Sequence, residues 1–473
     1  MTNWGLNLVV VLSCLELTFA SASQYLKLNH STTFESNFFN TPLNNFDEVS
    51  PTFSLKVLHT NDFCGERSCS CSLFYAGGEG EVESFVENTL FLQELASRFS
   101  CNLVYAEHRW YGESIPGMNT IDPTNYTYLT SYQAMADFER IARNFSIPNT
   151  KTIAIGGSYG GMLAAWMRLT YPGTFDGAFA SSASVLYPFE EEYSDTDLYE
   201  IVSDDFEECR EGIHSAFLSL RELSTSELFA NIQDILGLCE APINQVESNN
   251  TIALLQQSLT NVAQLDYPFE TNFLFPLPAN PVNKACELFA ELGGGIAGLR
   301  NAASLTLGEK DQCIEVSLEH FHSFAPGLID GPWAVQRCTD LVMPATVGEG
   351  NKMYLSCSEF DQNCFYAGHE SQAEFCKAVY GVDEIFPNDE TKKNHGGVEQ
   401  FNDIGNIIFS YGSLDIWSGA GRVQNDERAA ELDLIWIEGG AHHADLRGAN
   451  EADPPSFAQA RARETEIIGG WLA

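Results

Sequence analysis

The chain has 473 residues, of which 65 are acidic and 24 basic, so its formal net charge is −41 at pH 7. Such a charge repels the phosphates of nucleic acids and of anionic membranes, which excludes both as expected partners. Hydrophobic residues make up 44% of the chain and aromatic residues 12%, too many for an acidic disordered protein. The length predicts two or three domains, or one large domain that carries an insertion.

The first predicted element is a secretory signal peptide at residues 1–22. An apolar stretch runs from Leu6 to Phe19, and residues 20–22 are small, as a cleavage site requires. The segment has no Lys or Arg, so an uncleaved anchor stays open, although the apolar run is short for a span of about 20 residues. We expect a secreted protein, or a lysosomal or vacuolar one, without membrane contact after cleavage.

Cysteines and glycosylation sequons fit a secretory route. Cleavage after Ala22 would remove Cys14 and leave twelve of the 13 cysteines, an even number that predicts disulfides in an oxidising compartment. Cys69 and Cys71 match neither a redox nor a zinc motif, and we expect both cysteines to take part in disulfides. Four Asn-X-Ser/Thr sequons predict a glycoprotein; they begin at Asn29, Asn125, Asn144 and Asn249.

From Thr52 to about Ser184, short β-rich runs alternate with helical patterns, which is typical of a largely parallel sheet. The predicted strands lie at Ser72–Tyr75, Leu103–Tyr105 and Thr152–Ile155. Apolar residues on helical spacing predict a helix at Phe85–Phe99, between the first two of these strands.

Between about Pro188 and Gly397 the pattern changes to helices with long polar connections, such as Ile201–Leu223 and Ser226–Leu238. Eight cysteines lie in this segment, and eight cysteines allow 105 pairings that the sequence does not resolve. Strand patterns return at 406–409 and 434–437, before a closing helix at 458–472.

These patterns predict an α/β fold with an inserted helical, disulfide-rich domain. The expected division is a signal peptide at 1–22, a core in two parts at 23–187 and 398–473, and the inserted domain at 188–397.

A nucleophile motif follows the third predicted strand. Residues 156–160 read Gly-Gly-Ser-Tyr-Gly, which matches G-x-S-x-G, with a β-branched run before them and an apolar helical pattern after them. Glycines must flank the serine in such a turn because the backbone is strained and helix and strand approach closely. The context favours Ser158 as a nucleophile over a glycine-rich turn without chemistry.

A serine nucleophile needs a histidine to take its proton and a carboxylate to orient that histidine. In this type of fold the chain order is serine, acid, histidine, and the last two lie on loops after the final strands. Asp415 follows the strand pattern at 406–409, with Asp445 as its main rival. His442 and His443 follow the pattern at 434–437; we favour His442 as the base and expect a structural role for His443.

Two backbone N–H groups should stabilise the oxyanion that forms during acyl transfer. One is expected from Tyr159, the residue after the nucleophile, and the other from Gly78, in the glycine-rich loop after an early strand. This loop does not match a dinucleotide-binding motif, because Glu83 stands where a third glycine is needed. We expect no cofactor.

Two further groups of residues are weaker candidates for a functional site. Glu319, His320 and His322 lack another ligand at a recognisable spacing, so we expect no metal site. His108 precedes the serine in the chain, and we expect it in a buried polar network rather than as a second base.

In these motifs the chain resembles the secreted and lysosomal serine exopeptidases that include Pro-X carboxypeptidase, dipeptidyl peptidase II and thymus-specific serine protease. The resemblance extends over most of the mature chain. It implies an α/β-hydrolase fold with a helical, disulfide-bonded cap, and it implies Ser158 as nucleophile, Asp415 as acid and His442 as base. Six segments carry it: 74–80, 107–114, 156–172, 333–339, 414–419 and 440–447.

Some positions depart from the pattern of that family. Ile416 stands where the family often has proline, Val335 where it has an aromatic residue, and Gly78 where it has asparagine. Trp333 and Trp417 remain available as apolar walls for a substrate. The departures therefore bear on the preference for proline and not on the triad.

The resemblance leads us to expect an exopeptidase that hydrolyses peptides after proline through an acyl-enzyme, in carboxypeptidase or dipeptidyl peptidase mode. Glu79 could bind a substrate's amino terminus, which would favour the dipeptidyl mode, or could hold its loop through Arg109 or backbone amides. The alternatives are an esterase or lipase on the same fold and a noncatalytic binding glycoprotein. A homodimer stays open.

Overall fold

The structure is a computed structural model, and it describes fourteen stretches of the chain. These are residues 25–27, 32–65, 68–117, 126–187, 194–225, 229–242, 245–308, 313–314, 332–343, 345–356, 376–377, 393–395, 400–421 and 432–473. The expected signal peptide, the sequons at Asn29 and Asn125, and the cluster of Glu319, His320 and His322 lie outside the described residues.

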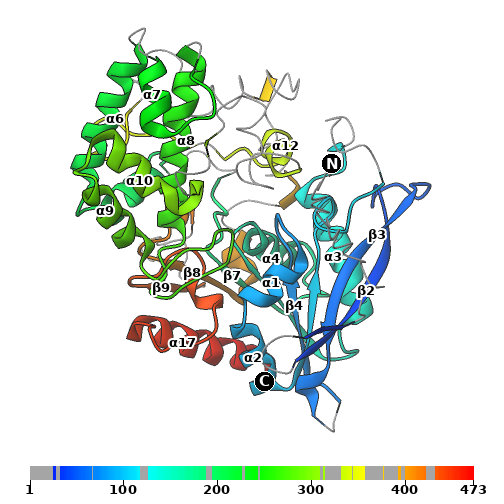
Figure 1. The fold of residues 1–473 in the computed structure, drawn as a ribbon. Coiled ribbons are helices and arrows are strands. Elements are labelled where there is room, and N and C mark those ends of the chain that lie inside the picture. Colours follow the sequence, from blue (N-terminus) through cyan, green and yellow to red (C-terminus); the bar gives the residue numbers. More distant parts are fainter. Residues whose placement is uncertain are drawn as a thin grey trace, which may run out of the picture.

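Nine strands of the described residues form one sheet in the order β1-β2-β3-β5-β4-β6-β7-β8-β9 (Figure 1). The first three strands pair in antiparallel fashion, and strands β4 to β9 run parallel. Their bounds are Tyr25–Lys27 (β1), Thr33–Pro42 (β2), Thr52–Thr60 (β3), Cys71–Ala76 (β4), Cys101–Ala106 (β5), Lys151–Gly157 (β6), Gly177–Ser181 (β7), Ile407–Gly412 (β8) and Asp433–Ile437 (β9).

Every residue of β4, β5, β7 and β8 is buried, because helices cover both faces of a parallel sheet. The strands predicted near residues 72, 103, 152, 406 and 434 are confirmed as β4, β5, β6, β8 and β9. The sequence pattern misses β7, whose Gly-Ala-Phe-Ala-Ser sequence has no β-branched residue.

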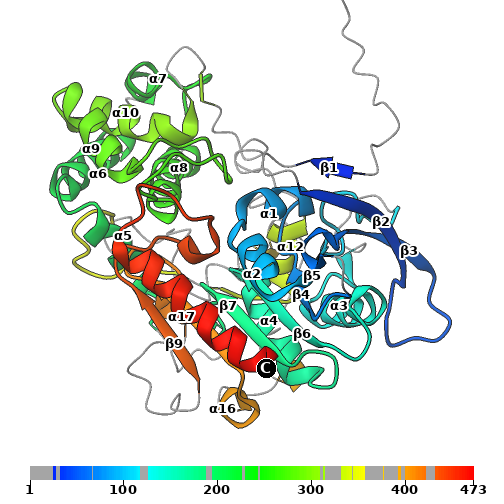
Figure 2. The ribbon, with the colours of Figure 1, turned by 90° about the horizontal axis from the view of Figure 1, so that it is seen from below.

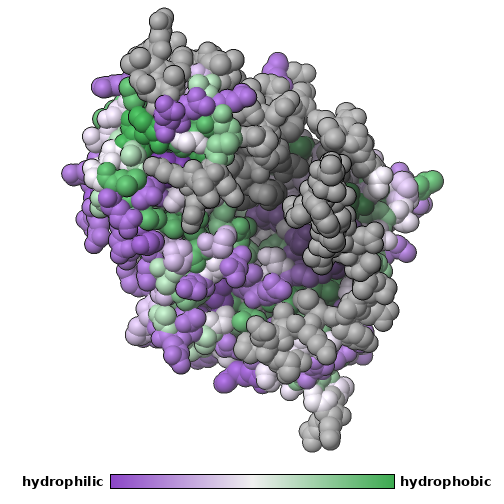
Figure 3. Space-filling view, in the orientation of Figure 1, coloured by the Kyte–Doolittle hydropathy of each residue, from purple (hydrophilic) through white to green (hydrophobic). Residues whose placement is uncertain are grey.

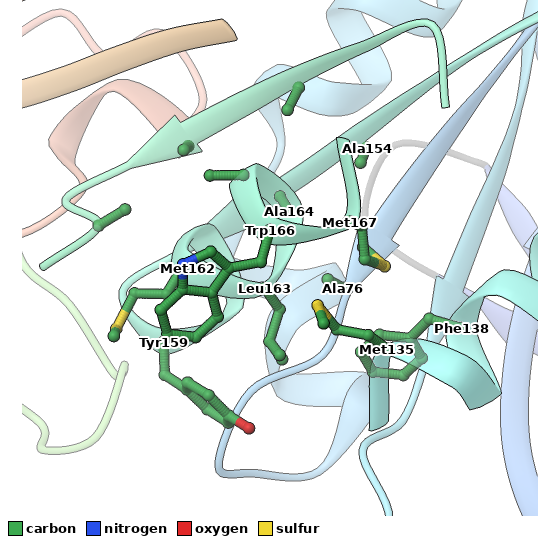
Figure 4. Packing of buried hydrophobic residues seen from close by; sticks show 14 of the residues in the cluster. Ala76, Met135, Phe138, Ala154, Tyr159, Met162, Leu163, Ala164, Trp166 and Met167 are labelled. Atoms are coloured by element: carbon green, nitrogen blue, oxygen red, sulfur yellow. The ribbon is translucent and has the colours of Figure 1, made fainter. Parts of the chain in front are cut away.

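Side chains alternate between two apolar cores along the central strands. Leu73 and Tyr75 of β4 face the core that contains helices α2 (Phe91–Phe99) and α17 (Pro455–Leu472), and Figure 2 shows α17 lying along this face. Phe74 and Ala76 face the opposite core, which contains α3 (Ser131–Phe145) and α4 (Tyr159–Thr170). Figure 4 shows side chains of α3 and α4 packed together there. The nucleophile turn therefore lies between a buried strand and a buried helix.

The helix predicted at 85–99 is wrong as a single element. The structure has two helices, α1 (Val82–Asn88) and α2, separated at Thr89, whose φ is −128° and ψ 52°. The Thr89 hydroxyl donates to the Phe85 carbonyl at 2.7 Å and lies 3.1 Å from the Tyr105 hydroxyl. These side-chain hydrogen bonds compete with the backbone ladder at the point where α1 ends.

Between β7 and β8 the chain forms a helical bundle with its own apolar core, which Figure 1 shows beside the sheet. The helix predicted at 201–223 is in fact two, α5 and α6, because residues 206–209 form turns. The bundle helices are α5 (Asp197–Asp205), α6 (Arg210–Thr225), α7 (Phe229–Leu236), α8 (Gln245–Gln264), α9 (Pro281–Glu291) and α10 (Gly295–Leu307). Two later helices, α12 (Pro332–Thr339) and α16 (Gln400–Ile404), pack against the core of the sheet. We keep 188–397 as the proposed bounds of the cap domain.

Five disulfides lie within the described residues, and they confirm the expectation of disulfides. Cys69 and Cys71 have different partners, Cys64 and Cys101, so both are structural. Three more pairs lie after β7: Cys209–Cys286, Cys239–Cys313 and Cys338–Cys376.

The surface agrees with the composition of the chain. Hydrophilic side chains cover much of the face in Figure 3, as expected from 65 acidic residues. Among the helices that the structure describes, none has the length and apolar character to cross a membrane.

Candidate active site

Ser158 lies in a strained turn between β6 and α4. Its φ is 57° and its ψ −128°, values that few residues other than glycine adopt, and such strain is found at nucleophile turns. A Cβ on Gly156 would lie 2.1 Å from the Gly160 carbonyl oxygen, and one on Gly160 would lie 2.5 Å from the Ala76 carbonyl oxygen. Both positions therefore require glycine, as the motif predicts.

Asp415 and His442 form a buried hydrogen-bonded pair. Asp415 Oδ1 lies 2.8 Å from His442 Nδ1, and the two side chains are 0% and 1% exposed. Asp415 Oδ1 also accepts the Trp417 N–H at 3.2 Å. Because an ionised carboxylate only accepts hydrogen bonds, the proton of a neutral His442 ring lies on Nδ1 and Nε2 is left as a base.

The loop of His442 lies directly against the nucleophile turn. A Cβ on Gly157 would come within 3.2 Å of the His443 ring. The His443 N–H donates to Ser182 Oγ at 2.7 Å, and the neighbouring Ser181 carbonyl accepts the Ser158 N–H at 2.9 Å. The three predicted triad residues thus follow the carboxyl ends of β6, β8 and β9, the edge at which open parallel sheets bind ligands.

Asp445 and His443, the alternative candidates for the acid and the base, make hydrogen bonds with other groups. Asp445 accepts hydrogen bonds from the hydroxyls of Ser181 and Ser410 and ties β7 to β8. His443 Nδ1 lies 2.9 Å from an Arg447 Nη, a group that only donates, so the ring proton of His443 lies on Nε2. Burial, helped by the charges of His442 and Arg447, holds the pKa of His443 well below its usual value. The structure brings His442, and not His443, to a carboxylate.

Gly78 lies beside the first turn of α4. A Cβ at this position would be 3.5 Å from the Gly160 nitrogen and 4.0 Å from the Tyr159 ring. The neighbouring Gly77 N–H donates to the Ala106 carbonyl at 3.0 Å. Within the described stretches, the N–H groups of Gly78 and Tyr159 have no acceptor. Buried donors rarely stay unpaired, so this pair is available for a substrate oxygen.

Glu79 is half-buried next to these donors. Burial raises the pKa of its carboxyl, while a hydrogen bond from its own backbone and the nearby charge of His442 lower that pKa in part. The structure does not bring Arg109 to Glu79, because the Arg109 guanidinium binds Asp137 through two hydrogen bonds of 2.6 and 2.8 Å. Of the roles expected for Glu79, holding its loop through Arg109 is therefore wrong, whereas a hydrogen bond to a backbone amide is present; binding of a substrate's amino terminus stays a prediction.

Trp333 and Trp417 approach the site from different segments. The Trp333 ring, on α12, lies 5.4 Å from the Tyr159 ring. The Trp417 ring, just after Asp415, lies 6.3 Å from the His442 ring. The two indoles thus stand beside the predicted oxyanion donor and the predicted base.

The expectation for His108 is confirmed. Its ring is fully buried, and burial lowers the pKa of the imidazole to about 3. Its Nε2 lies 3.0 Å from the Tyr159 hydroxyl. The sequence analysis misses the other members of this network, Tyr111, Gln336 and Asp340; the position of Gln336 in a segment shared with the family was the available signal.

In the part of the chain that the structure describes, no three His, Cys, Asp or Glu side chains form a group suited to a metal ion. A parallel sheet covered on both faces, a strand-serine-helix turn and an inserted helical cap together define an α/β-hydrolase. The family model described as Serine carboxypeptidase S28 matches residues 41–464, so the chain belongs to that family and is a serine-type exopeptidase.

Relatives match nearly the whole chain. Lysosomal Pro-X carboxypeptidase of Bos taurus is 32% identical over 90% of this chain and 85% of its own length. Prolyl carboxy peptidase like protein 5 of Caenorhabditis elegans is 33% identical over 85% of this chain and 82% of its own. The solved structure of proline iminopeptidase from Mycobacterium smegmatis covers 92% of this chain and 98% of its own, at a TM-score of 0.38 and 10% identity.

Proposed function

We propose that this chain is a post-proline serine carboxypeptidase, with Ser158 as nucleophile, His442 as general base and Asp415 as the residue that orients the base. The observation that carries this proposal is the 2.8 Å hydrogen bond between Asp415 and His442, on the same sheet edge as the Ser158 turn. The Pro-X carboxypeptidases at 32% identity support the carboxypeptidase mode and the preference for proline.

In this proposal Ser158 Oγ attacks the carbonyl carbon of the last peptide bond while His442 Nε2 takes the hydroxyl proton. The N–H groups of Tyr159 and Gly78 stabilise the oxyanion. The C–N bond breaks, the imidazolium returns its proton to the amine of the leaving amino acid, and an acyl-enzyme remains. Water then attacks the ester, again with His442 as base, and Ser158 is released. Asp415 stabilises the imidazolium in both halves of the reaction.

Two features bear on the substrate. The apolar rings of Trp333 and Trp417 lie beside Tyr159 and His442, which suits a proline ring in the substrate. Glu79 influences which end of the peptide the site accepts. A carboxyl with a raised pKa is neutral over a wider pH range than a free glutamate, so it repels the terminal carboxylate of a substrate less. The dipeptidyl mode would instead need Glu79 ionised, to bind an amine.

We also propose a lysosomal or secreted location. The support comes from the relatives whose names call them lysosomal, and from disulfides, which form in oxidising compartments.

The decisive measurement follows two substrates at pH 5: release of phenylalanine from an N-blocked peptide ending in Pro-Phe, and release of a reporter from Lys-Pro-reporter. We expect turnover of the first alone. Glu79→Gln should keep this activity and extend it to pH 7, because it removes the negative charge that develops as the pH rises. Turnover of Lys-Pro-reporter alone, with loss of it in Glu79→Gln, would show the dipeptidyl mode instead.

Variants test the triad in the same assay. Ser158→Ala should abolish turnover and labelling by a fluorophosphonate probe, and His442→Gln should lower kcat by roughly 10⁴-fold or more. His443→Gln, the matched control on the next residue, should cost far less. A wild-type protein that neither hydrolyses these peptides nor takes the label on Ser158 would overturn the proposed function, and turnover of acyl esters alone would favour an esterase.

A further inference from the structure

A buried polar network joins the cap helix α12 to the first turn of α4. The Tyr159 hydroxyl lies 2.7 Å from Gln336 Nε2 and 3.0 Å from His108 Nε2. The Tyr111 hydroxyl donates to Gln336 Oε1 at 3.0 Å. All four side chains are buried, so each of these hydrogen bonds is shielded from water. Figure 4 shows Tyr159 at the start of α4.

The proton positions in this network follow from its two ends. His108 Nδ1 lies 2.8 Å from the Arg109 carbonyl oxygen, which only accepts, so Nδ1 carries the ring proton and Nε2 is an acceptor. The Tyr159 hydroxyl therefore donates to His108. Its oxygen is then free to accept from the Gln336 amide, and the Gln336 carbonyl accepts from Tyr111. The directions agree at every step, and no other arrangement of the protons satisfies all the groups.

The second N–H of the Gln336 amide is used as well. It donates to Asp340 Oδ2 at 3.2 Å, and the same carboxylate accepts the Ser131 N–H at 2.7 Å. Replacing the Gln336 amide by an apolar group would leave the Tyr159 oxygen without its donor and Tyr111 without its acceptor. Because buried polar groups without partners are costly, the carboxamide is specifically required at this position.

The network holds the residue whose backbone N–H is a predicted oxyanion donor. Three groups fix the Tyr159 side chain: His108 from the loop after β5, and Gln336 and the Trp333 ring from α12. Two of the three thus belong to the cap helix. An oxyanion donor contributes most when its position is fixed before the reaction, and misplacement by about 1 Å can cost about a hundredfold in rate.

We propose that Gln336 is a positioning residue: through its hydrogen bond to Tyr159 it couples the position of α12 to the geometry of the oxyanion hole. This inference rests on the proposed function, because it assigns the Tyr159 N–H to the oxyanion. Gln336 does not touch the reacting atoms in this proposal. It acts on kcat, while ground-state binding of the peptide is left to other groups.

The test is a double-mutant cycle with Gln336→Met, Tyr159→Phe and both together, assayed on the Pro-Phe peptide. Each single variant should lower kcat by about tenfold, since each removes the same hydrogen bond, with KM changed less than twofold. The double variant should be no slower than the slower single variant. The rate of labelling by a fluorophosphonate should fall in parallel with kcat, because the probe also uses the oxyanion hole.

Gln336→Glu gives a second readout in case Gln336→Met does not fold. The new carboxyl is isosteric and still accepts from Tyr111, but when ionised it cannot donate to Tyr159, and it faces Asp340. The kcat deficit should grow as the pH rises and shrink at low pH, where a protonated carboxyl again offers a donor. His108, neutral because its pKa is about 3, does not titrate with it above pH 5. Asp340, whose pKa burial raises to about 6, titrates in the wild-type protein as well, so the deficit is measured as the ratio of the two kcat values at each pH.

Two controls separate positioning from loss of stability. Leu341→Ala, in the buried core just after α12, should lower the melting temperature and leave kcat unchanged. Thr339→Val, at an exposed position of the same helix, should change neither. The inference is overturned if Gln336→Met and Tyr159→Phe keep kcat within twofold, if their losses multiply in the double variant, or if Leu341→Ala lowers kcat equally. An inactive wild-type protein would refute the proposed function instead.

Discussion

At the scale of residues, two aspartates near the histidine loop make different contacts, and we expect different consequences when each is replaced. Asp415→Asn should lower kcat by roughly 10⁴-fold. The asparagine amide can donate to His442 Nδ1, and the ring proton then moves to Nε2, where it blocks the base. Asp445 accepts from two hydroxyls and from the Leu446 N–H. Asp445→Asn should therefore lower the free energy of unfolding by about 1–3 kcal/mol.

Steady-state kinetics and thermal unfolding of both variants check this prediction. Asp415→Asn should show the larger kinetic loss and Asp445→Asn the larger loss of stability. If Asp445→Asn lost as much kcat as Asp415→Asn while remaining folded, Asp445 would be the acid after all.

The candidate nucleophile, acid and base can be predicted from sequence because each lies in a local motif after a strand. The network around Tyr159 cannot, because Gln336 is 177 positions away in the chain; its place in a segment shared with the family marks the residue and does not reveal its partners. The same holds for Arg109, whose partner Asp137 gives no signal in sequence. Only the packed structure shows which polar side chains share a buried space.

At the scale of elements, the start of α1 depends on one buried carboxylate. Glu107 Oε1 accepts the N–H of Val82, the first residue of α1, at 3.1 Å. Its Oε2 accepts the Glu113 N–H at 2.9 Å and the Ser114 hydroxyl at 2.7 Å. Gly112 fits only as glycine, because a Cβ there would be 1.9 Å from Glu107 Oε1. Glu107 thus fixes the point at which the Gly78 loop becomes a helix.

We expect Glu107→Gln to destabilise this junction at pH 8, where the carboxyl is ionised because its pKa is about 7, since an amide placed among three donors leaves at least one N–H without an acceptor. The free energy of unfolding should fall by about 1–3 kcal/mol, and kcat should fall with it because the Gly78 loop is less well fixed. Denaturant unfolding and peptide kinetics measure the two effects. Glu113→Gln is the control, because its carboxylate is 62% exposed and pairs with Lys56; we expect less than about 0.5 kcal/mol. Equal effects in the two variants would contradict the role of Glu107.

Strands were predicted more accurately than helices, because a continuous apolar run marks a buried strand. The central strands β4, β5, β6 and β8 are continuous apolar runs because both faces are buried, and so they could be identified. The edge strand β9 is only partly buried, but residues 434–437 are also an apolar run. Helices were overextended at 85–99 and 201–223, since apolar spacing continues across Thr89 and across the turns at 206–209. Periodicity records which residues face the core and does not record where a side-chain hydrogen bond ends a helix.

At the scale of the whole molecule, charge and buried carboxyls act together on stability. A net charge of −41 disfavours the compact state at neutral pH through self-repulsion. Burial also raises the pKa of several carboxyls, to about 7 for Glu107 and about 6 for Asp266 and Asp340. The same cause raises the pKa values of Glu79, Asp197, Asp205, Asp433 and Glu464.

The sign of the effect follows from proton linkage. A carboxyl with a raised pKa holds its proton more tightly in the folded state than in the unfolded state. Its stabilising contribution to the free energy of unfolding is therefore fully present when the pH lies below its pKa in the unfolded state, and it is lost as the pH rises through its pKa in the folded state. For Glu107 this window runs from about 4.5 to about 7. Four histidines have the opposite effect on the pH dependence of stability. Burial lowers the pKa values of His59, His108, His395 and His443, so the folded state loses stability as the pH falls below about 6.5 and these rings bind protons more tightly in the unfolded state.

The carboxyls outnumber the histidines, and protonation also relieves self-repulsion, so we expect a higher melting temperature at pH 5 than at pH 8 in low salt. Added salt screens the repulsion between surface charges and leaves the buried groups nearly unaffected. The difference between the two pH values should therefore shrink in 0.5 M salt without vanishing. Scanning calorimetry at both pH values and both salt concentrations measures the two contributions. Equal melting temperatures at pH 5 and pH 8 in low salt would refute the prediction, and a difference abolished by salt would assign all of it to the surface.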